Sequence, residues 1–186
     1  MKQSEHSKHQ DTSSQPNCIG FPPSICNDCR VLILGSMPGV ASLKAQQYYA
    51  YAQNRFWPMM SLLLENTETV PEIYEERLHM LHRHHIGLWD AIGTCDRDGS
   101  LDSAIQNETG NDFSVLLEKH PSVKLICCNG AKAFQCFKKW NKALLTREGL
   151  TVLSMPSTSP ANARWRMEML VNTWRNALEQ VPGVIG

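Results

Sequence analysis

The chain has 186 residues, 42% of them hydrophobic and 19% charged, and its 18 basic and 18 acidic side chains give a formal net charge of zero. This length suits one domain with a buried core, and the absence of any run of about 18 apolar residues argues against a membrane span. The polar start lacks the apolar segment of a secretory signal, and the odd number of cysteines, seven, suits a reducing compartment better than a disulfide framework. We therefore expect a soluble intracellular protein, cytoplasmic or, in a eukaryote, nuclear.

The zero net charge conceals an asymmetry along the chain. Residues 65–118 contain twelve acidic and three basic side chains, a balance of −9, whereas residues 124–176 contain nine basic and two acidic ones, a balance of +7. Such a distribution can steer a polyanion toward one face of a neutral molecule. Charged faces of surface helices without any partner explain the same counts, so both interpretations stay open at this point.

The predicted elements alternate along the chain. Residues 1–20 are polar without apolar periodicity and are predicted to form a disordered tail, followed by one domain over 21–180 and a short C-terminal tail over 181–186. Apolar runs predict strands over 31–34, 86–92, 123–128 and 151–155. Helical spacing predicts helices over 56–65, 71–84, 131–140 and 164–179.

Alternating strands and helices favour an α/β fold, with three α/β/α layers around a central, mostly parallel four-stranded sheet. In such folds ligands bind at the carboxyl ends of the strands. The segments at those ends are unusual in composition: residues 35–39, Trp89-Asp90, Asn129-Gly130 and residues 156–163. The sequence therefore predicts a site at this edge.

The first of these segments is Gly-Ser-Met-Pro-Gly, residues 35–39. Glycine lets the backbone approach a ligand closely and Pro38 stiffens the turn, but the Lys-Ser/Thr of a phosphate-binding P-loop is missing. A tight turn without a ligand would explain this segment alone. The aromatic side chains that follow are too closely spaced for all to be core residues, and they suit a pocket for a planar base: Tyr48, Tyr49, Tyr51, Phe56 and Trp57.

Five motifs in order carry a resemblance to a known family: GSMPGVASLKAQQYYAYAQNRFW, GLWDAI, GSLDSAI, CNGAKAF and MPSTSPANAR. Together they resemble the uracil-DNA glycosylase superfamily, and within it the branch described as hypoxanthine-DNA (deoxyinosine) glycosylases. The resemblance implies a uracil-DNA glycosylase-like fold and a hydrolase that flips a deaminated base out of DNA in base excision repair. We expect DNA as the partner, a monomer, and no cofactor or metal.

The resemblance also implies which residue is catalytic. Mismatch-type relatives carry a catalytic asparagine where this chain has Met37, and uracil-specific relatives carry a histidine where it has Met155. In the hypoxanthine branch the catalytic role is attributed to another asparagine, which corresponds to Asn54. Its carbonyl can accept a hydrogen bond from water and its amide can donate one, although it is no strong base. A turn or helix-capping asparagine is the alternative.

Asp90 stands where relatives that read uracil or thymine have an asparagine. An ionised carboxylate only accepts hydrogen bonds, so it would favour hypoxanthine, which has a ring NH beside its carbonyl, over adenine, which does not. An unpaired Asp90 facing adenine would cost about 1 to 3 kcal/mol. The alternative is an aspartate that caps a helix or forms a salt bridge. Phe56 is the expected stacking platform, with core packing as its alternative, and the remaining predicted base-binding residues are Gly35, Ser36, Met37 and Tyr49.

The segment over 156–163 precedes a basic helix and offers short hydroxyls and backbone NH groups that suit phosphate oxygens. In the superfamily this loop pinches the DNA backbone and inserts a wedge. We assign phosphate contact to Ser157 and Ser159, wedge duty to Ala161 and Asn162, and DNA contact to Arg164. An ordinary Ser/Pro loop capping a helix remains the alternative. The motif over 99–105 receives no chemical role.

Two further patterns are interpreted as structural. Cys26 and Cys29 form a CxxC without the further ligands of a zinc site, and the histidines at 79, 82, 84 and 85 resemble a solvated helix face. The preferred function is a monofunctional hypoxanthine-DNA glycosylase, since no lysine lies in the catalytic motifs and only Lys44 leaves strand cleavage open. Alternatives are a glycosylase for uracil, xanthine or another damaged base, and a catalytically inactive DNA-binding relative.

Overall fold

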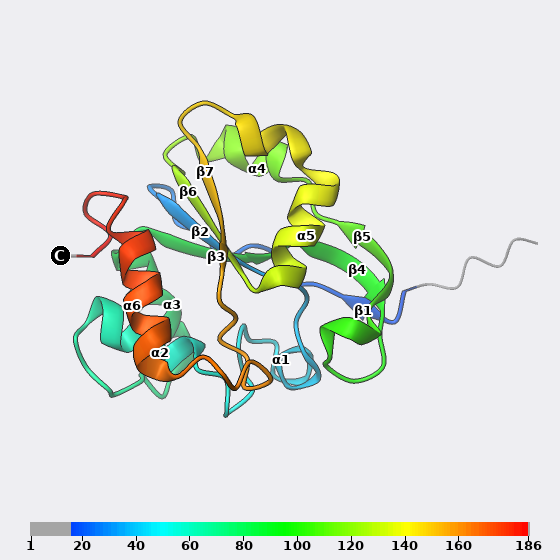
Figure 1. Ribbon diagram of the computed structural model, residues 1–186, viewed down its shortest axis with the longest axis horizontal. Coiled ribbons are helices and arrows are strands. Elements are labelled where there is room, and N and C mark those ends of the chain that lie inside the picture. The colour runs from blue at the N-terminus through cyan, green and yellow to red at the C-terminus, as the bar shows by residue number, and fades with distance from the viewer. Residues whose placement is uncertain (1–15, 186) are drawn as a thin grey trace, which may run out of the picture.

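The four apolar runs form one parallel sheet at the centre of the computed structural model, which describes residues 16–185 (Figure 1). The sheet order is β3-β2-β6-β7 and every neighbouring pair is parallel. The bounds are β2 Val31–Gly35, β3 Ile86–Asp90, β6 Leu125–Asn129 and β7 Thr151–Met155. β2 and β6 are almost wholly apolar because helices cover both of their faces.

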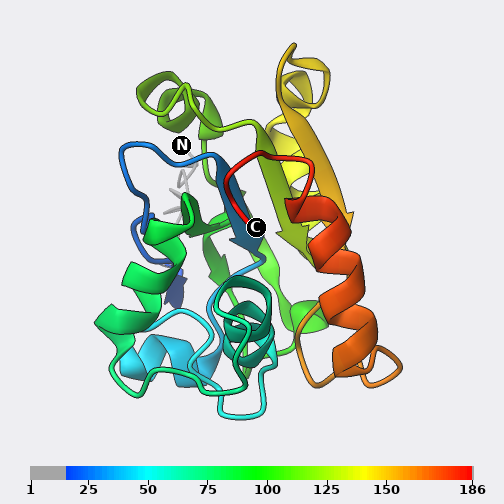
Figure 2. The same ribbon diagram turned by 90° about the vertical axis from the view of Figure 1, so that its left-hand side faces the viewer.

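Alternate side chains of β2 enter two separate hydrophobic cores. Val31 and Ile33 pack with α2 (Phe56–Leu64), α3 (Tyr74–Arg83) and α6 (Met167–Leu178). Leu32 and Leu34 face α4 (Phe113–Lys119) and α5 (Ala131–Trp140) on the opposite side. Figures 1 and 2 show the two helix layers with the sheet between them. The predicted three-layer α/β/α architecture is confirmed.

A second, three-stranded antiparallel sheet was not predicted. It has the order β1-β4-β5 and consists of β1 Cys18–Ile19, β4 Ile92–Asp96 and β5 Gln106–Gly110. The predicted strand over 86–92 is therefore two strands, because the chain turns after Asp90, where the Ala91 NH donates to the Gly35 carbonyl at 2.8 Å. Four helices were also absent from the sequence prediction: α1 Val40–Ala45, η1 Asp102–Ala104, α4 Phe113–Lys119 and η2 Lys142–Thr146.

Both ends of the folded region reach further than predicted. Residues 1–15 of the predicted tail lie outside the described residues. Cys18, however, is buried and stands opposite Cys95 in the antiparallel register of β1 and β4. At the other end Val184 is fully buried in the core on the α6 side. Its carbonyl oxygen lies 2.8 Å from His84 Nδ1. The C-terminal segment therefore contributes core contacts and is not a free tail up to residue 185.

Within residues 16–185, none of the helices has both the length and the hydrophobicity to cross a bilayer. All four strands of the parallel sheet end at the same edge, where the loop after β7 lies beside the segment that leads into α2, in the lower part of Figure 1. Arg55 N donates to the Thr158 carbonyl at 3.1 Å across this junction. The segments that contain the predicted site residues meet at this edge.

Candidate active site

Gly35 and Asp90 end neighbouring strands and are register partners in the sheet. A Cβ atom at position 35 would collide with Asp90 Oδ1 and lie 3.6 Å from the Tyr49 hydroxyl oxygen. The side chains of Asp90 and Tyr49 therefore fold over the glycine, which explains why a side chain is excluded there. The predicted proximity of these three residues is present in the structure.

The Asp90 carboxyl is buried, with 3% of the residue exposed, and its Oδ2 has no hydrogen-bond partner among the described residues. Burial raises its pKa to about 7, an effect that the nearby Arg97 charge opposes and Asp102 reinforces. Neither sequence alternative, a helix cap or a salt bridge, describes this residue. An unpaired buried carboxyl destabilises the fold, so it is a feature more typical of a binding site than of a structural one.

Asn54 is tied to the loop after β7 by its side-chain carbonyl. Asn54 Oδ1 accepts from the Phe56 NH at 3.0 Å and from the Thr158 hydroxyl at 2.9 Å. Thr158 Oγ1 in turn accepts from Asn129 Nδ2 at 3.0 Å. The carboxyl end of β6, the loop after β7 and the segment before α2 therefore meet here. Both lone pairs of Asn54 Oδ1 are thus used. This oxygen therefore has no lone pair left to accept the predicted hydrogen bond from water.

The hydrogen bonds of Asn54 have two consequences, one for the start of α2 and one for the side-chain amide. The bond to the Phe56 NH fixes the first residue of α2, as expected of a turn or capping asparagine. The second bond joins Asn54 to the other loops of the site and leaves its Nδ2 without a partner among the described residues. Only this amide group remains to interact with a ligand.

Phe56 is not available as a stacking platform, because it is fully buried. One face of its ring is covered by Tyr49, with ring centroids 3.8 Å apart and an angle of 18° between the planes. Trp57 packs edge-on against the same ring at 5.0 Å. The core alternative for Phe56 is therefore correct, and Tyr49 is the outer, partly exposed aromatic of the stack.

Tyr49 is held in position by its backbone and its hydroxyl group. Its φ of 54° lies in the left-handed region, which a tyrosine rarely adopts and which therefore marks a constrained position. The hydroxyl accepts from Asn129 Nδ2 at 3.2 Å, and burial raises its pKa well above the usual range. The hydroxyl consequently stays protonated and neutral near Asp90.

The turn over 35–39 is held by the motif that had no assigned role. Ser36 Oγ donates to Asp102 Oδ1 at 2.6 Å, and Ser100 Oγ accepts from the Val40 NH at 2.9 Å. The buried Arg97 donates to the Pro38 carbonyl. Residues 97–102 therefore support the turn from outside. This role could not be predicted, because the segment lies between β4 and β5 of the antiparallel sheet, which was not predicted.

Met37 belongs to the same turn as Gly35 and Ser36. It is buried in the core on the α4 and α5 side of the sheet. Its predicted base-binding role is not supported by this position, because packing beneath the turn accounts for the side chain. Of the residues predicted from the first motif, Gly35 lies at the site and Ser36 supports its wall.

The loop after β7 is organised by hydrogen bonds among its own residues. Ser157 Oγ accepts from the Ser159 NH at 3.2 Å, and Ser159 Oγ accepts from the Ala161 NH at 3.3 Å. Asn162 Nδ2 donates to the Ser157 carbonyl at 3.0 Å, so this side chain stabilises the loop and is not free to act as a wedge. Ala161 and Arg164 are exposed.

Arg55 was missed by the sequence reasoning, although it stands inside the Asn-Arg-Phe-Trp motif. Its guanidinium donates to the Ser159 carbonyl at 2.6 Å, to the Thr158 carbonyl at 3.2 Å and to the Asn162 carbonyl at 3.2 Å. It also donates to the Trp165 carbonyl. This one side chain fixes the shape of the loop after β7. The position of a cation beside Asn54 was a signal that could have drawn attention to Arg55, but its carbonyl partners are not visible in the sequence.

The remaining ionisable groups give no second site. Among residues 16–185 no cluster of three or more His, Cys, Asp or Glu side chains has metal-binding geometry. Burial raises the pKa of the Cys29 thiol to about 12 and also raises that of Cys26, which keeps both protonated and unreactive. His85 Nδ1 lies 2.7 Å from Asp28 Oδ2, and Ser24 Oγ lies 3.1 Å from His82 Nε2.

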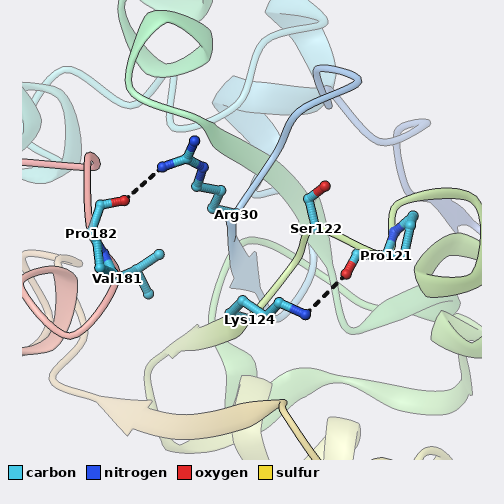
Figure 3. Close-up of a pocket in the computed structure, with 6 residues that line it drawn as sticks. All are labelled: Arg30, Pro121, Ser122, Lys124, Val181 and Pro182. Carbon is cyan, nitrogen blue, oxygen red and sulfur yellow. Dashed lines mark hydrogen bonds between the residues drawn. The ribbon is translucent and has the colours of Figure 1, made fainter.

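A surface hollow of about 510 Å³ lies at the opposite, amino end of the strands (Figure 3). Its two cations already donate to backbone carbonyls, Arg30 to Pro182 at 2.7 Å and Lys124 to Pro121 at 3.3 Å. It contains none of the motif residues. Its lining residues are Arg30, Pro121, Ser122, Lys124, Val181 and Pro182.

Comparison with known proteins identifies similar chains. The model of the family described as the uracil DNA glycosylase superfamily matches residues 22–179. A Methanosarcina acetivorans protein named hypoxanthine DNA glycosylase is 40% identical over 147 residues, covering 78% of this chain and 89% of the relative. A protein of the same name from Methanosarcina barkeri is 36% identical over 146 residues, covering 78% and 88%.

A solved structure has the same fold. It is a solution NMR structure from Methanosarcina acetivorans, presented as that of a candidate uracil DNA glycosylase, with a TM-score of 0.70 and 37% sequence identity. The match covers 87% of this chain and 98% of the solved one. The two chains therefore share their fold over most of their lengths.

Proposed function

Because this chain belongs to the uracil DNA glycosylase superfamily, we propose that it is a monofunctional DNA glycosylase that excises hypoxanthine, the deamination product of adenine. The relatives named hypoxanthine DNA glycosylase, 36 to 40% identical over most of the chain, support this substrate. The observation that carries the proposal is the buried Asp90 carboxyl, which has an unpartnered oxygen at the edge of the sheet.

The everted base lies on Tyr49 in this proposal. Tyr49 is the outer ring of the stack on Phe56, and its ring provides a flat apolar surface beside Asp90 and Gly35. An ionised Asp90 accepts from the N1–H of hypoxanthine, whereas the N1 lone pair of adenine would leave the carboxylate unpaired. Extruding the base costs a few kcal/mol, and less for a mispaired base, which adds to the selectivity.

Cleavage of the N-glycosidic bond places positive charge on the sugar and negative charge on the departing base. Asn54 is no strong base and its carbonyl already accepts from Thr158, so catalysis by this residue depends on positioning and on hydrogen bonds to the developing charges. Exposed Arg164 and the hydroxyl groups of Ser157 and Ser159, which accept within the loop and can still donate, contact DNA phosphates, and Ala161 faces the gap left by the base. The enzyme acts as a monomer, with no cofactor.

The positions of the lysines disfavour the alternative of strand cleavage. Lys44 is exposed on α1, and Lys132, which follows β6 in the first turn of α5, has its Nζ 3.5 Å from Glu108 Oε1. Without an amine near the anomeric carbon no Schiff base forms. We therefore expect an intact abasic site as the product.

A cleavage assay tests the function. Duplexes carrying one deoxyinosine, deoxyuridine or deoxyxanthosine are incubated with the protein and then treated with alkali to cut abasic sites. Alkali-dependent cleavage of the inosine duplex, with little of the uracil one, is expected. The proposal fails if only uracil is released, and a protein that binds these duplexes but releases no base would be an inactive DNA-binding relative.

A further inference from the structure

The hydrogen bonds around Asn54 form a chain whose direction is set by the backbone. The Thr158 NH donates to Asn129 Oδ1 at 2.9 Å, which fixes the orientation of the Asn129 amide. Asn129 Nδ2 must then donate, and it does so to Thr158 Oγ1 at 3.0 Å and to the Tyr49 hydroxyl at 3.2 Å. Because an amide NH2 cannot accept, the Thr158 hydroxyl hydrogen is left to donate elsewhere. Its partner is Asn54 Oδ1, at 2.9 Å.

A second backbone group gives Asn54 the same orientation. The Phe56 NH donates to Asn54 Oδ1 at 3.0 Å, so two donors converge on one carbonyl oxygen. A flipped carboxamide would place its NH2 against both donors and lose both bonds. Thr158 is fully buried and Asn129 is buried, so water cannot replace the lost partners. The polarity of the Asn54 side chain is therefore locked.

We propose that Asn54 acts on the substrate only as a hydrogen-bond donor, through Nδ2, and that Thr158 and Asn129 are positioning residues that enforce this polarity. The inference rests on the proposed glycosylase function. During hydrolysis the bond between C1′ and the base breaks, and its electron pair leaves with the base. The water oxygen bonds to C1′, and the water proton passes to the released base or to solvent. Asn54 takes up no proton. Its NH2 donates a hydrogen bond either to the departing base, where negative charge develops, or to the oxygen of the attacking water.

The substitution Asn54→Asp distinguishes a donor from an acceptor. It keeps the shape and the oxygen that Phe56 and Thr158 bind, but it replaces the NH2 by an oxygen that is an acceptor when ionised. Near pH 8 we expect the single-turnover rate on an inosine duplex to fall by about 100-fold or more, as for Asn54→Ala. In acid the protonated carboxyl regains an O–H donor, so the rate relative to wild type should rise as the pH falls.

An acceptor role for Asn54 gives the opposite pattern. Substantial activity of Asn54→Asp near pH 8, declining relative to wild type in acid, would overturn the inference. Asn176→Asp, an exposed asparagine-to-aspartate change on α6, is the matched control and should follow the wild-type pH profile. Dividing each variant rate by the wild-type rate at the same pH removes the titration of Asp90 from the comparison.

Thr158 provides a second test of the same chain. Thr158→Val keeps the volume but removes the hydroxyl that locks Asn54, and it should lower the single-turnover rate by about tenfold while the DNA dissociation constant changes by less than about twofold. Thr158→Ser restores the hydroxyl and should restore most of the rate. Thr146→Val, at an exposed threonine in η2, controls for the substitution itself.

The outcomes separate this inference from the proposed function. Equal rates for the valine and serine variants, with melting temperatures showing that both fold, would overturn the positioning role. A wild-type protein that releases no base would overturn the glycosylase function and this inference together. Active wild type with an equally active Asn54→Asp at neutral pH would overturn the inference alone.

Discussion

Asp90 is the residue on which base selectivity depends in this account. Its carboxyl is buried and its Oδ2 is unpaired at the strand end. Asp90→Asn places a donor and an acceptor there, which can pair with the edge of hypoxanthine or of adenine. We predict that the ratio of kcat/KM for deoxyinosine over mispaired deoxyadenosine falls by about tenfold or more. An unchanged ratio would remove Asp90 from base recognition.

The ionisation of Asp90 also predicts how stability depends on pH. Its pKa is raised from 3.8 in a free aspartate to about 7 by burial, so the folded state retains a proton that the unfolded chain has already released between these values. Asp90 therefore destabilises the fold progressively as the pH rises from about 4 to 7, with little further change above. The sign is opposite to that of a salt-bridged aspartate.

Asp90→Asn should consequently be more stable than wild type at alkaline pH. We predict that the difference in unfolding free energy between variant and wild type grows by about 2 to 3 kcal/mol between pH 5 and pH 8. Urea unfolding at both pH values measures it. A difference that stays constant would mean that Asp90 titrates normally in the folded protein.

The limits of sequence reasoning are clearest at Tyr49 and Phe56. Both are aromatic and lie seven positions apart, and the motif favoured Phe56 as the platform. Which ring is outermost depends on the start of α2 and on the φ of 54° at Tyr49, neither of which is visible in the sequence. Asp90 and Gly35 could be predicted because strand ends of a parallel sheet meet at one edge.

At the level of elements, the loop after β7 depends on Arg55. The guanidinium donates to the carbonyls of Thr158, Ser159, Asn162 and Trp165. We predict that Arg55→Ala weakens binding of duplex DNA by about tenfold and lowers the melting temperature, because the loop loses its shape.

Arg55→Lys tests whether shape or charge matters. An ammonium group is a point donor without the planar fork of a guanidinium, so lysine should not restore DNA binding. Full rescue by lysine would show that Arg55 contributes only its charge. Arg147→Ala, an exposed position at the amino end of β7, should leave binding and melting temperature unchanged.

The central sheet was predictable because its strands are short apolar runs that alternate with helical segments. The antiparallel sheet was not, because β5 is the polar segment Gln106–Gly110, mostly exposed, and β1 contains two residues. These strands exist through pairing with β4 and not through a local pattern. The support that residues 97–102 give to the first motif was hidden for the same reason.

For the whole molecule, a neutral net charge coexists with a basic C-terminal half, residues 124–176, whose last helix borders the site. A contact between Arg164 and a DNA phosphate would release counterions, so this part of the binding weakens with salt. We predict that Arg164→Ala reduces the slope of log K against log salt concentration by about 1 and weakens binding to all duplexes alike. Arg147→Ala should keep the wild-type slope, and an unchanged slope for Arg164→Ala would exclude a phosphate contact.

A crystal structure of the Asn54→Ala variant with a duplex containing deoxyinosine tests the central claim most directly. We predict an everted hypoxanthine stacked on the exposed face of Tyr49, with its N1 within about 3 Å of an Asp90 carboxylate oxygen. A purine bound at the carboxyl edge with its N1 turned away from Asp90, or a base stacked elsewhere than on Tyr49, would contradict the account.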